Sequence, residues 1–249
     1  MTAAVWAQAF PGGVADVDLQ HLLARTTSGH LVAVRLADGQ VLWRSAEALR
    51  PLLLGHGLAL GLALGLSPGT TSAPVRVVAL ALHEAGAERW RSAPLPWPEW
   101  AAQGDAAAAS VGLHAGWLAD RILLRWSLQP LYRGGAAPGP SRAKAPSVSG
   151  SCLLDMASGA LHGAPADAAP VTVPPVPQEP SDDPCVVAQQ VLGGVRYSLR
   201  QVQAQEQAPG SVTGTLHTTL TAHDTARGLD LWQCLLDDAP RKAPRALRS

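Results

Sequence analysis

The sequence predicts an all-β fold, a small β-propeller of about four four-stranded blades with long proline-rich loop insertions. Three observations lead to this prediction. A glycine-turn-tryptophan unit recurs along the 249 residues, and tryptophan outnumbers the other aromatic residues, with eight Trp against two Tyr and one Phe. In addition, no long segment shows the 3.6-residue period of an amphipathic helix. An excess of one large aromatic residue indicates that a single structural position is filled repeatedly.

The recurring unit reads as a β-hairpin whose turn contains glycine, with tryptophan four residues after that glycine. The repeated positions are Ala33, Gly39 and Trp43 in the first copy, Gly86 and Trp90 in the second, Asp155 and Gly159 in the third, and Ala222, Asp224, Gly228 and Trp232 in the fourth. The third copy carries Gly163 where tryptophan is expected. Glycine suits such turns because it adopts positive φ without steric cost. We therefore expect the tryptophans to be buried wedges between neighbouring sheets.

Each hairpin has candidate partner strands upstream, including Ala3–Phe10 before the first and Leu52–Leu66 before the second. The prediction is a single domain over residues 1–235, because one hairpin cannot bury both of its faces alone. Its approximate blades are residues 1–46, 50–92, 110–163 and 185–235.

Two further segments are expected on the surface. Residues 163–184 contain seven prolines, which cannot donate to a sheet ladder, and they read as a surface insertion. Pro174, Pro177 and Pro180 recur every third residue, the period of a polyproline II helix, and form a candidate docking edge for a partner. Residues 236–249 read as a basic flexible tail, in which Asp237 is interpreted as a solvated loop charge.

At these hairpins the sequence resembles the PQQ-like (quinoprotein-type) propeller repeat, whose pattern runs Ala-Leu-Asp, Thr-Gly and then Trp. In the first copy, Arg35 replaces the Asp and Asp38 replaces the Thr. The resemblance implies a propeller. It implies quinone chemistry only for the large dehydrogenases, which are longer and carry an adjacent cysteine pair. The three cysteines here stand apart, and many relatives are non-enzymatic scaffolds, so the resemblance favours a non-enzymatic and degenerate member.

No motif in the sequence predicts catalysis, a cofactor or a metal. The segment 65–69 spells G-x-S-x-G, but Pro68 lacks the N–H that an oxyanion hole requires after the nucleophile Ser67. The glycines around His56 lack the helix that a dinucleotide loop needs, and we expect them in a strand. The eight histidines show no metal-ligand spacing. We therefore predict no catalytic residues, no metal ligands and no cofactor.

Two functions remain open. The favoured hypothesis is a non-enzymatic protein-interaction scaffold, and the alternative is a small-ligand or quinone cofactor-binding propeller related to oxidoreductases. A polar funnel of converging Asp, Arg and His would favour the alternative. The formal charge of zero argues against a nucleic-acid partner, and the longest apolar run is too short to span a membrane. With no signal peptide visible, we expect a cytoplasmic protein with a protein partner of unknown identity.

Overall fold

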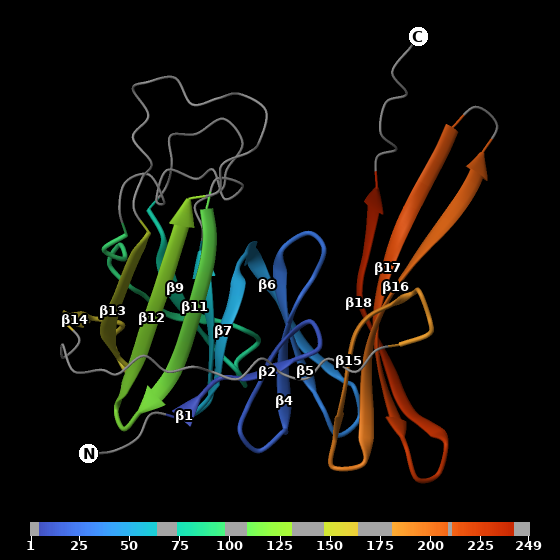
Figure 1. Cartoon of the computed structure of the whole chain (residues 1–249), viewed down its shortest axis with the longest axis horizontal. Coiled ribbons are helices and arrows are strands. Elements are labelled where there is room, and N and C mark those ends of the chain that lie inside the picture. Colours follow the sequence, from blue (N-terminus) through green and yellow to red (C-terminus); the bar gives the residue numbers. More distant parts are fainter. Residues whose placement is uncertain are drawn as a thin grey trace. The chain divides into compact units, whose positions relative to one another are not determined.

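The computed structural model describes residues 5–63, 74–97, 109–130, 147–163, 181–208 and 211–241. Within these ranges every regular element is a β-strand, and the strands form four antiparallel sheets of four or five strands (Figure 1). This confirms the predicted fold class, because the sheets have the number and size of the blades in a small propeller. The chain divides into two compact units, Met1–Ala7 with Leu49–Pro174, and Gln8–Ala48 with Pro175–Ser249.

The first unit contains two sheets. One runs in the order β10-β9-β8-β7, built from β7 (Arg50–Gly55), β8 (Leu58–Ala63), β9 (Arg76–Ala81) and β10 (Glu88–Arg91). The other runs β1-β11-β12-β13-β14, built from β1 (Val5–Trp6), β11 (Ala109–Leu118), β12 (Arg121–Pro130), β13 (Val148–Asp155) and β14 (Leu161–Gly163). Leucine, valine and tryptophan side chains from both sheets form one buried core, as expected for sheets that stack face to face.

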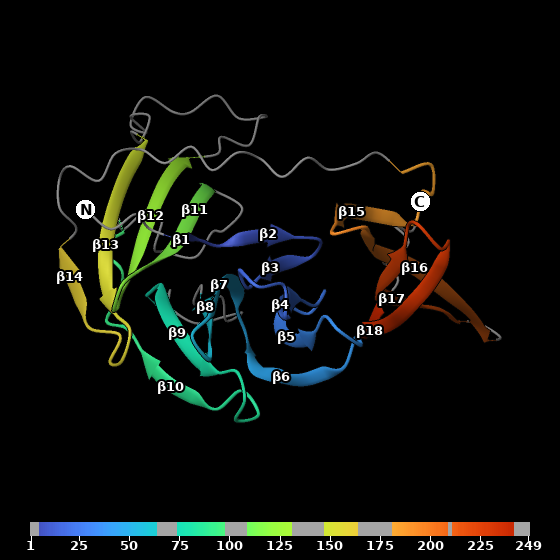
Figure 2. The ribbon, with the colours of Figure 1, turned by 90° about the horizontal axis from the view of Figure 1, so that it is seen from below.

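The second unit also contains two sheets. The first, in sequence order, comprises β2 (Gln8–Phe10), β3 (Gly13–Ala15), β4 (His21–Arg25), β5 (His30–Arg35) and β6 (Val41–Ala48). The second comprises β15 (Val186–Leu192), β16 (Val195–Ala208), β17 (Ser211–Asp224) and β18 (Leu229–Arg241) (Figure 2). A separate buried core joins these two sheets, with Leu22 and Val32 on one side and Leu220 and Leu236 on the other.

Three local expectations differ from the observed strands. The segment 3–10, expected in the first blade, is divided, because β1 pairs with β11 while β2 pairs with β3. The segment 52–66, expected as one strand, forms a hairpin of β7 and β8 in its described part up to Ala63, in which His56, at φ 50°, and Gly57 make the turn. Finally, β18 extends to Arg241, so residues 236–241 belong to a strand rather than to a flexible tail.

Candidate functional site

Three of the four repeat turns share one backbone conformation. Gly39, Gly159 and Gly228 have φ values of +72°, +69° and +67°, the left-handed region that favours glycine. In each turn the glycine N–H donates to the carbonyl four residues earlier, at 2.9, 2.8 and 2.9 Å respectively. These turns are therefore structurally equivalent positions in three sheets, which makes their surroundings directly comparable.

The first residue of each of these turns stabilises it through its side chain. In the third copy, Asp155 accepts the backbone N–H of Ser158 at 2.8 Å and its hydroxyl at 2.7 Å. The Ser158 hydroxyl is the main reason that the pKa of the Asp155 carboxyl lies below its usual value. Asp224 accepts two turn N–H groups in the same way. Such Asx turns explain why aspartate suits this position.

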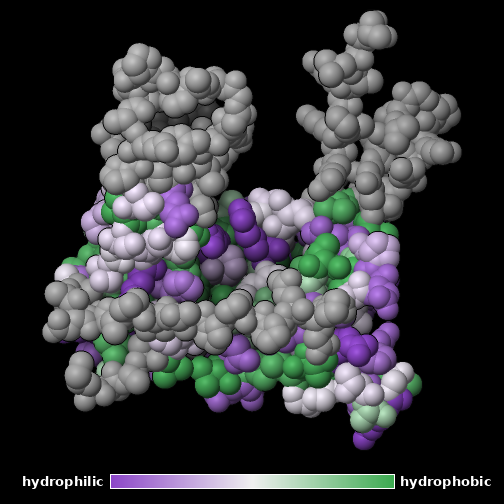
Figure 3. Space-filling model, in the orientation of Figure 1, coloured by the Kyte–Doolittle hydropathy of each residue, from purple (hydrophilic) through white to green (hydrophobic). Residues whose placement is uncertain are grey.

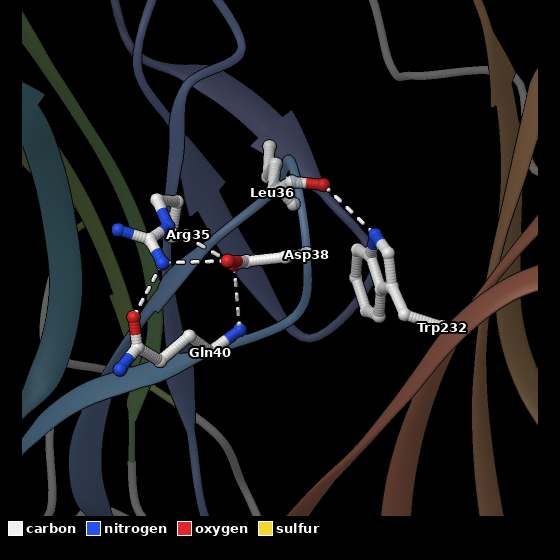
Figure 4. Close-up of polar contacts among 5 residues, drawn as sticks. All are labelled: Arg35, Leu36, Asp38, Gln40 and Trp232. Atoms are coloured by element: carbon white, nitrogen blue, oxygen red, sulfur yellow. Dashed lines mark hydrogen bonds and ion pairs between the residues drawn. The ribbon is translucent and has the colours of Figure 1, made fainter.

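The first copy has the same turn conformation, but different side chains stabilise it. Arg35 stands where the other two have Asp, and it forms an ion pair with Asp38 at 2.5 Å (Figure 4). The hydrogen bond from Arg35 is the main cause that lowers the pKa of Asp38. Asp38 also accepts the backbone N–H of Gln40 at 3.1 Å. The first turn thus departs from the repeat pattern at positions 35 and 38, but an aspartate still accepts a backbone N–H of the turn. That aspartate is Asp38, which is held by Arg35.

Two of the repeat tryptophans lie against turn glycines of another sheet in the same unit. Trp90, on β10, donates its indole N–H to the Met156 carbonyl at 2.8 Å and covers Gly159. Trp232, on β18, donates to the Leu36 carbonyl at 2.9 Å (Figure 4). Its ring also covers Gly39. In both contacts the accepting carbonyl belongs to the residue three positions before the glycine.

These contacts require glycine for a second reason besides backbone conformation. A Cβ added to Gly39 would lie 2.6 Å from a ring carbon of Trp232, and one added to Gly159 would be closer still to Trp90. Real Cβ atoms essentially never approach other heavy atoms below 3.0 Å. The glycine therefore acts as a flat surface on which the indole lies, and each indole joins two sheets into one core.

The remaining repeat residues are placed as follows. Trp43 and Trp90 are buried and Trp232 is half-buried, while Ala33 and Ala222 are fully buried in the strands before their turns. The Gly86 turn is one residue longer than the other three, because its N–H donates to the carbonyl of Ala81, five residues earlier. Ala85 takes positive φ there, at 52°. This extra residue explains why the second copy matches the repeat pattern less well.

The first unit also contains an open cavity of about 380 Å³ beside the β7–β8 hairpin. Its polar walls are His56, His83, Glu84 and Arg89, and its apolar wall includes Trp90. Glu84 and Arg89 form an ion pair with each other. Among the described residues, no group of three or more His, Cys, Asp or Glu side chains could hold a metal ion.

One polar contact was missed by the sequence analysis. Asp237, interpreted as a solvated loop charge, is only 8% exposed and lies in β18, so that interpretation is wrong. Its carboxylate accepts the N–H of Thr27 at 2.7 Å, the N–H of Ser28 at 3.4 Å and the hydroxyl of Thr27. Beside it, Arg44 on β6 donates to the Leu235 carbonyl at 3.1 Å. The neighbouring proline and second aspartate made the segment look like a loop, although its carboxylate bridges two sheets of the second unit.

The cysteine thiols allow a first prediction. Cys152 and Cys234 are buried, and burial raises the pKa of both thiols, to about 12 for Cys152. Because the thiolate is the reactive form, we expect a thiol reagent at pH 8 to label Cys185 first and the other two only after unfolding. The contribution of these two thiols to stability should be constant below pH 9 and fall from pH 9 toward 12, since there the thiols ionise more readily in the unfolded chain than in the folded one. Rapid labelling of all three thiols in the native protein would contradict this.

Several sequence expectations fall outside the described residues. Pro174, Pro177 and Pro180 are among them, and so are Ser67 and its G-x-S-x-G segment. Within the described ranges, no helix has the length and apolar character needed to cross a membrane.

Comparisons with known proteins give no match by sequence and low similarity to solved structures. No protein-family model matches the sequence, and no curated protein matches it. Among solved structures, the chain is similar to BamB from Moraxella catarrhalis, with 13% identity and a TM-score of 0.31 over 89% of this chain and 61% of that one. It is also similar to the computationally designed Ika8 protein, with 11% identity and a TM-score of 0.25 over 96% and 87% of the two chains. The chain thus spans about three fifths of the BamB chain that it matches.

Proposed function

We propose that this chain is a non-enzymatic PQQ-like β-propeller repeat protein that acts as a protein-interaction scaffold. The observation that carries the proposal is how the repeat residues are used. Trp90 and Trp232 contact glycines of neighbouring sheets, and the aspartates of those two turns, Asp155 and Asp38, accept turn N–H groups. The residues that define the repeat thus hold sheets together, and binding is left to the surfaces and loops that they support.

The β15–β18 sheet offers the best candidate for such a binding surface. Seven large hydrophobic side chains are exposed among the described residues, and five of them belong to this sheet: Val187, Val202, Leu229, Leu231 and Leu235. Figure 3 shows green, hydrophobic residues among purple and white ones over this sheet, at the right of the view. Exposed apolar clusters rimmed by polar residues are typical of protein–protein contact surfaces.

The test of this proposal changes that surface without touching the core. Leu231 and Leu235, 49% and 45% exposed, are replaced together by Gln. The matched control replaces the exposed Val5 and Val17 by Gln. Tagged full-length chains are expressed in the native cell, crosslinked and purified, and the co-purifying proteins are quantified. We expect the leucine variant to lose its co-purifying proteins and the valine variant to retain them. An identical set of proteins with wild type and both variants would contradict the proposal.

The same experiment includes two checks. Thermal unfolding and circular dichroism of each variant must match wild type, so that a loss of partners reflects the surface rather than the fold. Cell fractionation tests the proposed cytoplasmic location, with the protein expected in the soluble cytoplasmic fraction.

The open cavity supports the alternative function, a small-ligand or quinone-binding propeller. Two histidines offer ring nitrogens, Arg89 offers a guanidinium group, and Trp90 offers an aromatic wall. A quinone with carboxylate groups should then quench tryptophan fluorescence on titration, and Arg89→Gln should abolish the quenching. Quenching that is absent, or equal in wild type and variant, would reject this alternative.

A further inference from the structure

The fourth repeat turn has the conformation of the first and third but lacks the indole that covers them. Gly228 matches Gly39 and Gly159 in φ and in its hydrogen bond to the residue four positions earlier. The other two glycines lie under the rings of Trp232 and Trp90. A Cβ added to Gly228, by contrast, would meet no atom within 4 Å. Among the residues that the structure describes, the surface on which an indole lies in the other two turns is therefore open in this one.

The hydrogen-bond acceptor of the turn is open as well. Leu36 and Met156, three residues before their glycines, accept the indole N–H groups. The corresponding residue in the fourth turn is Thr225, whose N–H and hydroxyl both bond to the Gly194 carbonyl. Its own carbonyl has no hydrogen-bond partner among the described residues. Both elements of the indole contact, a glycine surface and a carbonyl, are thus present without an indole.

The repeat itself supplies fewer indoles than turns. Position 163 of the third copy, where the pattern requires tryptophan, is glycine, so the repeat has three tryptophans for four turn glycines. Beside the open turn, Leu229 is 61% exposed immediately after Gly228 and Leu231 is 49% exposed on the same strand. The charged side chains of Arg227 and Asp230 are exposed next to them.

We propose that the turn at residues 224–228, with Leu229 and Leu231, is a docking site for a tryptophan side chain of a partner protein. The two occupied turns define its chemistry, since each receives its indole from the edge strand of a neighbouring sheet, β10 or β18. The partner is accordingly a β-sheet protein with a tryptophan on an edge strand. This proposal rests on the scaffold function and names the feature of the partner that the scaffold recognises.

A second copy of this chain fits the site poorly. Every tryptophan whose side chain the structure describes is buried or half-buried: Trp6, Trp43, Trp90, Trp97, Trp117, Trp126 and Trp232. Exposing Trp90 or Trp232 to a second copy would break an indole contact of its own. None of these seven described side chains is free to reach a second copy, and the proposal assigns the indole to a different protein.

The test uses 3-methylindole, the side-chain analogue of tryptophan, and the full-length chain. In a titration followed by nuclear magnetic resonance, we expect it to shift the backbone amide signals of residues 224–229. The analogue 1,3-dimethylindole has no N–H and should bind about three- to tenfold more weakly, the value of one hydrogen bond. Gly228→Asn should abolish the shifts, since asparagine tolerates positive φ while its Cβ occupies the place of the ring. Leu229→Gln should weaken them.

Each outcome decides one point. Shifts at the turn that disappear in Gly228→Asn support the site. The absence of shifts, equal binding of the two indoles, or shifts that persist in Gly228→Asn would overturn it. Self-association of wild type that Gly228→Asn removes, measured by sedimentation, would overturn the assignment to a different protein. Failure of the two proposals is distinguishable by readout, because indole binding is measured on the purified chain, whereas the scaffold proposal depends on whether the Leu231 and Leu235 variant loses its partners in the cell.

Discussion

Replacing Trp90 with alanine is expected to lower the free energy of unfolding by about 3–5 kcal/mol, the usual range for a buried tryptophan. The side chain is buried in the core of the first unit, and its N–H bonds to the Met156 carbonyl. Alanine would leave a cavity, uncover Gly159 and leave that carbonyl unsatisfied. Urea unfolding monitored by circular dichroism measures the loss.

Two further variants separate the contributions. Trp90→Phe keeps an aromatic ring over Gly159 without the N–H donor, and we expect it to lie between wild type and alanine. Leu229→Ala, at an exposed position, should change stability by less than about 0.5 kcal/mol. A loss below about 1 kcal/mol for Trp90→Ala would show that this indole does not hold the two sheets together.

Adding a side chain to the repeat glycines is expected to lower stability at two of the three equivalent turns and to leave it nearly unchanged at the third. Gly159→Asn and Gly39→Asn place a Cβ inside the volume of an indole and should cost about 1–3 kcal/mol through overpacking. Gly228→Asn places the same atom in open space. Because φ differs by only a few degrees among the three turns, the backbone cost of asparagine is shared, and differences in stability report the indole contact.

The relative stabilities of these three variants test both the indole contacts and the proposed docking site. Thermal or urea unfolding should place Gly228→Asn close to wild type and the other two well below it. Equal destabilisation of all three would mean that backbone conformation alone determines the cost, and that indole contact adds nothing. A strong loss in Gly228→Asn alone would mean that its turn is covered after all, contrary to the proposed docking site.

Much of the fold could be predicted from the sequence because its signals are local. Positive φ at Gly39, Gly159 and Gly228 follows from a glycine between two apolar runs. The four sheets follow from counting such hairpins together with their upstream strands. Periodicity and turn chemistry act over a few residues, so they are visible in a single chain.

Features that depend on distant partners were not predictable in the same way. The sequence indicated that Trp232 fills a slot, but its acceptor, Leu36, is 196 residues away. Nothing near Val5 indicates that β1 pairs with β11 rather than with β2. Asp237 is recognisable as buried only once the turn containing Thr27 is placed against it. In each case the deciding contact joins segments whose local sequences contain no information about each other.

The division of the second unit between the two ends of the chain has a consequence for its synthesis. Its core joins Leu22 and Val32 to Leu220 and Leu236, whereas the core of the first unit comes almost entirely from residues 49–174. During translation the first unit therefore has nearly all of its sequence while the N-terminal strands still lack their partners. Those strands would expose apolar side chains until the ribosome releases the C-terminal sheet. We expect chains truncated near residue 180 to contain a protease-resistant first unit and to require a chaperone for residues 8–48.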